Sequence, residues 1–125
     1  FSLKKSFEDV SKLVVLSFFA TWCIPCRAGI KQLNDNKVKL SKNNIKVVLV
    51  NLTYSNEKEE ENLESFIKDE KLTFTVIKDK SGEIAKRYGI TGSSLPRTFL
   101  VGKDFNIKKI IGSEGDDFIN NIVEQ

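Results

Sequence analysis

The sequence predicts an α/β domain built around a partly parallel sheet, and two observations lead to this prediction. The runs LVVLSFFA (residues 13–20) and IKVVLVNL (45–52) are apolar almost throughout, which is typical of strands covered on both faces. A helical stretch from Cys23 to about Leu40 separates them, as in a right-handed β-α-β unit. With 125 residues the chain can bury a substantial core, and we expect residues 1–125 to form a single domain.

The middle of the chain continues the alternation of helices and strands. Residues 56–71 predict an amphipathic helix, because apolar residues recur there at the spacing of one helical face. This face consists of Leu63, Phe66 and Ile67. The acidic run EKEEE at 57–61 fits the first turns of that helix, where carboxylates interact favourably with the helix dipole. TFTVIKD at 73–79 predicts a short strand or extended segment.

The last third of the chain predicts a short helix, a hairpin and a final helix. SGEIAKRYGI at 81–90 fits a helix that ends near Gly89, with three side chains pointing inward, namely Ile84, Ala85 and Tyr88. TFLVGKDFNIKKIIG at 98–112 predicts two strands joined by a turn at GKDFN. From about Gly115 we expect a helix with Asp116 and Asp117 in its first turn. Its buried face would consist of Phe118, Ile119, Ile122 and Val123.

The composition excludes several classes of function. The chain contains no histidine, which rules out a Cys–His pair and a Ser-His-Asp triad. With only two cysteines it lacks the four ligands of a structural zinc site, although a bare cysteine pair could still bind Cu(I). The net charge of +3 comes from lysines and glutamates spread along the chain, so nucleic acid is not an expected partner. No apolar run approaches the roughly 18 residues of a membrane span.

The two cysteines lie in TWCIPC at residues 21–26, directly after a predicted buried strand and at the start of a predicted helix. The N–H groups and partial positive charge of a helix N-terminus stabilise a thiolate, and Pro25 is well tolerated in a first helical turn. Cys26, one turn further in, could then attack a mixed disulfide formed at Cys23. A structural disulfide across four residues would stabilise the fold little, and a pair of inert buried thiols would not require Trp22 beside it. The spacing and context therefore favour a redox pair.

LVVLSFFATWCIPCRAGIKQL resembles the active-site segment of the thioredoxin superfamily, and nearly the whole chain resembles its TlpA/ResA-like branch. The resemblance implies a thioredoxin fold, with a central mixed β-sheet flanked by helices. VVLVNLTYSNEKEEENLESFIKDEKLTFTVIKD is similar to the central strand–helix insert of this branch and its flanks. SSLPRTFLVGKDFNIKKIIG is similar to its cis-proline loop and final hairpin, which implies a cis Leu95–Pro96 bond. The substrate groove would then be formed by Trp22, Ile24, Pro25, Leu95 and Pro96.

The chain also departs from the family pattern at three positions. Thioredoxins carry a buried Asp six residues before the first Cys, and this sequence has Ser17 there. Many TlpA/ResA-like proteins have a Glu three residues after the second Cys and a Pro two residues beyond it. Gly29 and Lys31 occupy those positions here. Other glutamates or water would have to supply the acid–base assistance that these family residues give.

The resemblance implies a thiol-disulfide oxidoreductase in which Cys23 is the nucleophile and Cys26 the resolving thiol, without a metal or organic cofactor. Because Ile24 and Pro25 offer no charge that would stabilise a thiolate, we expect a reductant of protein disulfides, with apocytochrome c as a possible client. The alternatives are a disulfide oxidant or isomerase and a Cu(I)-binding module. A peroxidase on this fold would need a Thr-x-x-Cys motif, whereas Thr21 lies only two residues before Cys23.

The expected partners follow from the same resemblance. They are protein thiol or disulfide substrates and an upstream redox partner, with no nucleic acid. We expect a monomer in an extracytoplasmic compartment, either periplasmic or facing outward from a membrane. An anchor in a segment before Phe1 would be compatible with a sequence that does not begin with Met.

Overall fold

The structure is a computed structural model that describes residues 12–112 and 117–124. In this part of the chain five strands form one sheet in the order β3-β2-β1-β4-β5. The strands are β1 (Leu13–Phe19), β2 (Ile45–Asn51), β3 (Thr75–Lys78), β4 (Arg97–Gly102) and β5 (Ile107–Ile111). The helices are α2 (Ile24–Asp35), α3 (Lys37–Lys42), α4 (Glu59–Asp69), α5 (Glu83–Arg87) and α6 (Phe118–Val123), with 3-10 turns η1 (Thr53–Ser55) and η2 (Gly92–Ser94).

The sheet is mixed, as predicted. Strand β1 pairs in parallel with β2, and β2 pairs in parallel with the edge strand β3. On the other side β1 pairs antiparallel with β4, which continues into the predicted hairpin with β5. All seven residues of β1 are buried, because this strand lies in the centre of the sheet with a hydrophobic layer on each face. This double burial explains its continuous apolar sequence.

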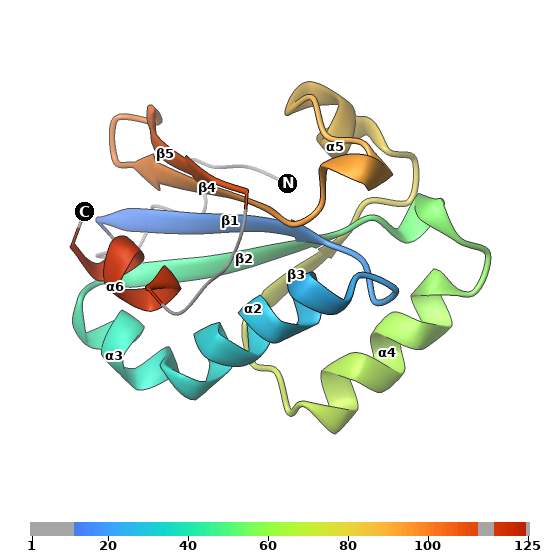
Figure 1. Cartoon of the computed structure of the whole chain (residues 1–125), viewed down its shortest axis with the longest axis horizontal. Helices are drawn as coiled ribbons and strands as arrows, with labels where there is room; N and C mark the ends of the chain where they lie inside the picture. Colours follow the sequence, from blue (N-terminus) through green and yellow to red (C-terminus); the bar gives the residue numbers. More distant parts are fainter. Residues whose placement is uncertain (1–11, 113–116, 125) are drawn as a thin grey trace.

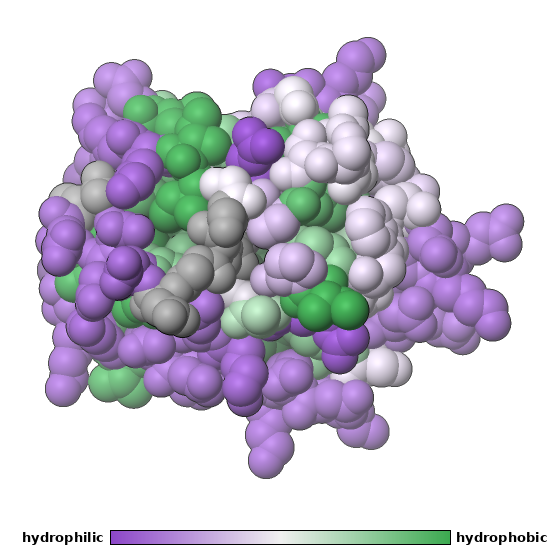
Figure 2. All heavy atoms as spheres, viewed as in Figure 1, coloured by the Kyte–Doolittle hydropathy of each residue, from purple (hydrophilic) through white to green (hydrophobic). Residues whose placement is uncertain are grey.

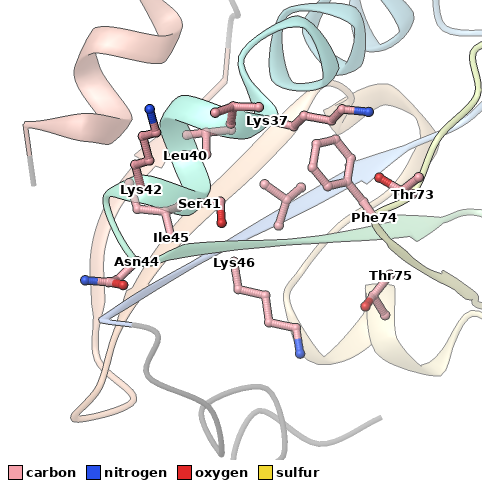
Figure 3. A pocket seen from close by; sticks show the side chains of 12 residues that line it. Lys37, Leu40, Ser41, Lys42, Asn44, Ile45, Lys46, Thr73, Phe74 and Thr75 are labelled. Carbon is pink, nitrogen blue, oxygen red and sulfur yellow. The ribbon is translucent and has the colours of Figure 1, made fainter.

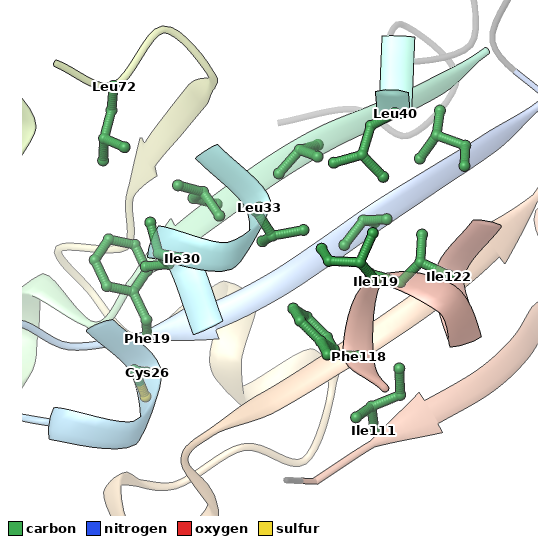
Figure 4. Close-up of a cluster of buried hydrophobic side chains, with 14 of the residues drawn as sticks. Phe19, Cys26, Ile30, Leu33, Leu40, Leu72, Ile111, Phe118, Ile119 and Ile122 are labelled. Carbon is green, nitrogen blue, oxygen red and sulfur yellow. The ribbon is translucent and has the colours of Figure 1, made fainter. Parts of the chain in front are cut away.

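Helices cover both faces of the sheet (Figure 1). On one face, α2, α3, α4 and α6 pack over a cluster that includes Phe19, Cys26, Leu63 and Phe118 (Figure 4). On the other face, α5 packs over a second cluster. Its aromatic residues are Phe18, Tyr88 and Phe99, whose rings contact one another in pairs. The predicted inward faces of α4, α5 and α6 are thus confirmed.

The helix predicted from Cys23 to about Leu40 is wrong as one element, because it breaks at Asn36 into α2 and α3. Asn36 has φ −111° and ψ 18°, outside helical geometry. Its side-chain Nδ2 donates to the carbonyl of Gln32 at 2.8 Å. Asparagine side chains compete with the helical backbone in this way, which favours a break.

Two helix starts differ from the prediction. Helix α4 begins at Glu59 and not at residue 56, because Asn56 Oδ1 accepts the Lys58 N–H at 2.8 Å in a turn before the helix. Helix α6 begins at Phe118, so Asp117 precedes it and does not lie in its first turn. The predicted start at Gly115 and the position of Asp116 lie outside the described residues. Gly89 follows α5 with φ +67°, as expected for a residue that ends a helix in left-handed conformation.

Hydrophilic residues surround much of the face seen in Figure 2, and apolar residues gather over the β4–β5 hairpin. Ile107 and Ile110 of β5 are exposed there, with Lys108 and Lys109 between them. Lysines of this kind discourage an edge strand from pairing with another chain. In the part of the chain that the structure describes, none of the helices has the length and hydropathy needed to cross a membrane.

Candidate active site

Cys23 and Cys26 form a disulfide at the N-terminus of α2, with their Cα atoms 5.3 Å apart. Strand β1 ends at Phe19, and a short turn brings Cys23 to the N-cap position of the helix. Its Sγ accepts the backbone N–H of Cys26 at 3.3 Å, and Pro25 lies in the first turn of the helix. The predicted position of the pair is therefore confirmed. A helix N-terminus stabilises negative charge on a capping sulfur.

The two sulfurs differ in their access to a partner. Cys23 keeps 6% of its surface exposed and Cys26 1%, and Figure 4 shows Cys26 on α2 at the edge of the core cluster. The residues around Cys23 are open to solvent, because Ile24 is 76% exposed and Trp22 48%. The first cysteine thus borders an apolar surface that a partner can approach, and the second one faces the protein core.

The loop before β4 contains the cis Leu95–Pro96 bond that the resemblance implied. It follows η2, whose Gly92 backbone lies so close to Trp22 that a Cβ built there would be 3.6 Å from the indole ring. Leu95 is half-buried and packs against both core clusters. The structure thus brings Trp22 together with the segment that leads into cis-Pro96, although about 70 residues separate them in the sequence.

The indole of Trp22 is also held by a hydrogen bond. Its Nε1–H donates to Ser55 Oγ at 3.0 Å, and Ser55 Oγ–H donates to the carbonyl of Leu52 at 2.6 Å. Leu52 and Ser55 belong to residues 52–58, which connect β2 to the insert helix α4. The insert therefore helps to orient the exposed ring beside the disulfide.

Ser17 and Gly29, the two positions where the family carries acidic residues, are both buried. The Ser17 hydroxyl hydrogen-bonds the Thr98 hydroxyl at 2.9 Å, which links β1 to β4. A serine hydroxyl does not ionise in the physiological range, and Gly29 has no side chain. These positions therefore provide packing and a neutral hydrogen bond, but no proton acceptor.

Sequence reasoning missed Glu59, the first residue of α4, which is fully buried. Its Oε2 accepts the Thr21 backbone N–H at 2.7 Å and Asn51 Nδ2–H at 2.8 Å, and its Oε1 accepts the Thr21 hydroxyl at 2.6 Å. An acidic run before a helix normally indicates a solvated first turn. The available signal was spacing, since Glu59 lies four residues before the core residue Leu63 and so shares its helical face.

Of two surface depressions, one lies far from the disulfide and the other lies beside it. A cleft of about 620 Å³ lies between α3, the start of β2 and residues 73–75 (Figure 3). Because β1 and β2 are parallel, it lies at the end of the sheet opposite to the disulfide, which follows the carboxyl end of β1. A second groove of about 430 Å³ includes Thr21 and Trp22 and runs between α2 and α4.

Among the described residues, no group of three or more His, Cys, Asp or Glu side chains is arranged to hold a metal ion.

Comparisons with known proteins agree with this geometry. Residues 1–110 match the AhpC/TSA family. Over 107 residues the chain is 34% identical to sporulation thiol-disulfide oxidoreductase A of Bacillus subtilis. The matched region makes up 82% of this chain and 63% of that protein. Over 100 residues the chain is 32% identical to thiol-disulfide oxidoreductase ResA of Geobacillus thermodenitrificans. The matched region makes up 80% of this chain and 54% of that protein.

A solved structure shares the fold. The crystal structure of StoA from Bacillus subtilis matches with a TM-score of 0.78 and 27% identity, covering 95% of this chain and 87% of that one. The chain spans 54–63% of the length of the two curated relatives named above. From its match over residues 1–110 and its thioredoxin-like sheet with a Cys23–Cys26 disulfide, the chain belongs to the AhpC/TSA family and is related to the thiol-disulfide oxidoreductases named above.

Proposed function

We propose that this chain, working as one domain, reduces disulfide bonds in other proteins. The observation that supports this function most directly is the position of the cysteine pair. Cys23 caps the N-terminus of α2 beside an exposed apolar surface, and Cys26 lies one turn deeper within sulfur–sulfur bonding distance of it. This arrangement suits one sulfur for attack and the other for release of the product.

The exchange proceeds in two displacements on sulfur. In the dithiol form, the Cys23 thiolate attacks one sulfur of the substrate disulfide, forming a mixed disulfide and releasing the other substrate sulfur as a thiolate. The Cys26 thiolate then attacks Cys23 Sγ, so the Cys23–Cys26 disulfide forms and the second substrate thiolate leaves. Two electrons pass to the substrate, and the two protons lost by the cysteines are balanced by two on the product thiols. An upstream dithiol partner regenerates the reduced form by the same steps in reverse.

The groove that receives the substrate consists of Trp22, Ile24, Pro25, Leu95 and Pro96. The exposed side chains of Trp22 and Ile24 support this proposal, because they provide an apolar surface next to Cys23. The backbone on the Leu95 side of the cis bond would pair with an extended segment of the substrate. A substrate with an apolar residue beside its cysteine would fit this surface best.

The direction of electron flow follows from the residues between the cysteines. The side chains of Ile24 and Pro25 carry no charge or donor that would stabilise a thiolate, which favours a strong reductant over an oxidant. Two relatives carry the names sporulation thiol-disulfide oxidoreductase A and thiol-disulfide oxidoreductase ResA. We therefore place the chain, as a monomer, in an extracytoplasmic compartment, where protein disulfides form and a dedicated reductant is needed. Apocytochrome c is a candidate client.

Insulin reduction with dithiothreitol as electron source tests the activity. The parent chain should accelerate precipitation of the insulin B chain, and Cys23→Ser should abolish the acceleration. Cys26→Ser should instead accumulate a mixed disulfide through Cys23, visible by non-reducing electrophoresis and mass spectrometry. A parent chain that binds one Cu(I) tightly but does not reduce insulin would favour the metal-binding alternative.

A further inference from the structure

The carboxylate of Glu59 is held inside the protein by hydrogen-bond donors alone. The side chain is 0% exposed and accepts hydrogen bonds from the Thr21 N–H, the Thr21 hydroxyl and the Asn51 amide. Ion pairs in the described part of the chain involve Glu60, Glu64 and Asp104, but not Glu59. A buried carboxylate is costly unless it is paired or hydrogen-bonded, so the donors must be arranged to keep it there.

Two of the three hydrogen bonds of Glu59 come from the turn that precedes the disulfide, and the third comes from the end of β2. Thr21 lies two residues before Cys23, and Asn51 ends β2, the strand next to β1. Asn51 Oδ1 in turn accepts the Thr53 hydroxyl at 2.8 Å, which fixes the amide with its Nδ2 toward Glu59. The first residue of the insert helix is therefore connected to the carboxyl ends of both central parallel strands.

We propose that Glu59 is a positioning residue that sets the redox properties of the Cys23–Cys26 pair. It holds the turn before Cys23 and places a buried negative charge near the N-terminus of α2. This inference rests on the proposed function, because it concerns the strength of the same dithiol as a reductant.

The sign of the effect follows from electrostatics. A negative charge near Cys23 disfavours its thiolate and opposes the effect of the helix N-terminus. In a dithiol–disulfide pair, stabilisation of the thiolate stabilises the reduced form and makes the pair more oxidising. A carboxylate that disfavours the thiolate therefore makes the pair more reducing. Burial matters here, because charges in the interior are screened much less than exposed ones.

The other charged groups near the site differ in exposure: Arg27 and Asp69 are exposed, whereas Glu70 and Arg97 are half-buried, and the Arg97 Nε is buried. Arg27, Asp69 and Glu70 border the groove beside Thr21 and Trp22, and Arg97 follows cis-Pro96. Arg27 is exposed, with its guanidinium 5.7 Å from the centre of the Phe66 ring. Arg27 and Arg97 are cations and favour the thiolate, so they oppose Glu59. Water and salt screen the exposed ones among these groups.

The test compares Glu59→Gln with Glu61→Gln, which removes the same charge from an exposed position two residues further along α4. The thiol pKa of Cys23 is measured from the pH dependence of its alkylation rate, and the dithiol–disulfide equilibrium is measured against glutathione. In Glu59→Gln the pKa should fall, and the equilibrium constant should shift about tenfold toward the dithiol, which corresponds to about 30 mV. Glu61→Gln should stay within twofold of the parent chain, and Glu59→Asp, which keeps the charge, should stay closer to the parent than Glu59→Gln.

A parent-chain measurement covers the case in which Glu59→Gln does not fold. The ¹³C chemical shift of the Glu59 carboxyl carbon should change in the reduced protein at the pH where Cys23 ionises, since coupling between two sites is reciprocal. No change at that pH, or a folded Glu59→Gln variant that loses stability while both redox measurements stay at parent values, would overturn the proposal. A parent chain without insulin reductase activity would refute the proposed function instead, and the titration would still report on Glu59.

Discussion

Asp79 offers the sharpest test of how the segment leading to the cis-proline loop is held. Its side chain is buried, and its two carboxylate oxygens accept the N–H groups of Ile84 at 3.3 Å and Ala85 at 2.9 Å, in the first turn of α5. Gly82, at the N-cap position with φ +79°, has no side chain to do this. Asp79 therefore caps α5 from three residues before the usual capping position.

The structure sets the size of the expected effect. Asp79→Ala leaves the Ile84 and Ala85 N–H groups at a partly buried helix start without acceptors, and each unsatisfied group costs up to about 1–3 kcal/mol. Part of this loss is offset, because a buried carboxylate no longer has to be desolvated. We expect the free energy of unfolding to fall by about 2 kcal/mol, at the upper end of a lost helix cap. Asp79→Asn keeps one acceptor oxygen and should lose about 1 kcal/mol.

Urea denaturation followed by circular dichroism measures these losses, and an unchanged m-value would show that the unfolded state is comparable. Asp35→Ala, which removes an exposed carboxylate at the end of α2, is the control and should change stability by less than about 0.5 kcal/mol. Tyr54 gives a second readout, because burial and the nearby Asp79 charge raise its pKa. In Asp79→Asn that pKa should fall, as followed by absorbance of tyrosinate. A folded Asp79→Ala protein as stable as the control would refute the capping role.

Three further predictions concern the core, the surface and the groove. Leu63→Ala should lower the free energy of unfolding by about 3 kcal/mol, because the side chain is fully buried, and a loss below about 1 kcal/mol in urea denaturation would contradict the packing of α4. The Lys108 ammonium lowers the pKa of Asp104 to about 2, so the stability from this carboxylate is present at neutral pH and lost as the pH falls from about 4 through 2. Lys108→Gln should raise that pKa in an NMR titration, and an unchanged value would mean that the ion pair does not form in solution. Trp22→Ala should raise KM for a protein disulfide while leaving the reduction potential unchanged, and a changed potential with unchanged KM would remove Trp22 from the groove.

The features that were predictable from the sequence are those set by local pattern. The apolar run of β1 indicates burial on both faces, and the position of Cys23 after it, with Pro25 in the next turn, indicates a helix N-terminus. The β4–β5 hairpin and the helix end at Gly89 follow from turn residues in the same way. The cis Leu95–Pro96 bond required the family resemblance, because composition does not distinguish it from a trans bond.

The features that were missed depend on contacts between distant residues or on a single side chain. Glu59 belongs to the site only because α4 packs its first turn against Thr21, 38 positions away in the sequence, and three acidic neighbours made it look solvated. The break at Asn36 depends on one amide that competes with the backbone, and the two residues before it, Asn34 and Asp35, are also weak helix formers. Neither feature changes the periodicity of the apolar residues, which is the signal that sequence reasoning reads best.

The reduction potential of the Cys23–Cys26 pair tests the proposed reductant most directly. It is measured by equilibration with glutathione buffers, with Cys26→Ala as the control that cannot form the disulfide. A potential near or below about −250 mV, in the range of thioredoxin, is the result that a protein disulfide reductant predicts. A potential above about −180 mV, in the range of disulfide isomerases and oxidants, would contradict it.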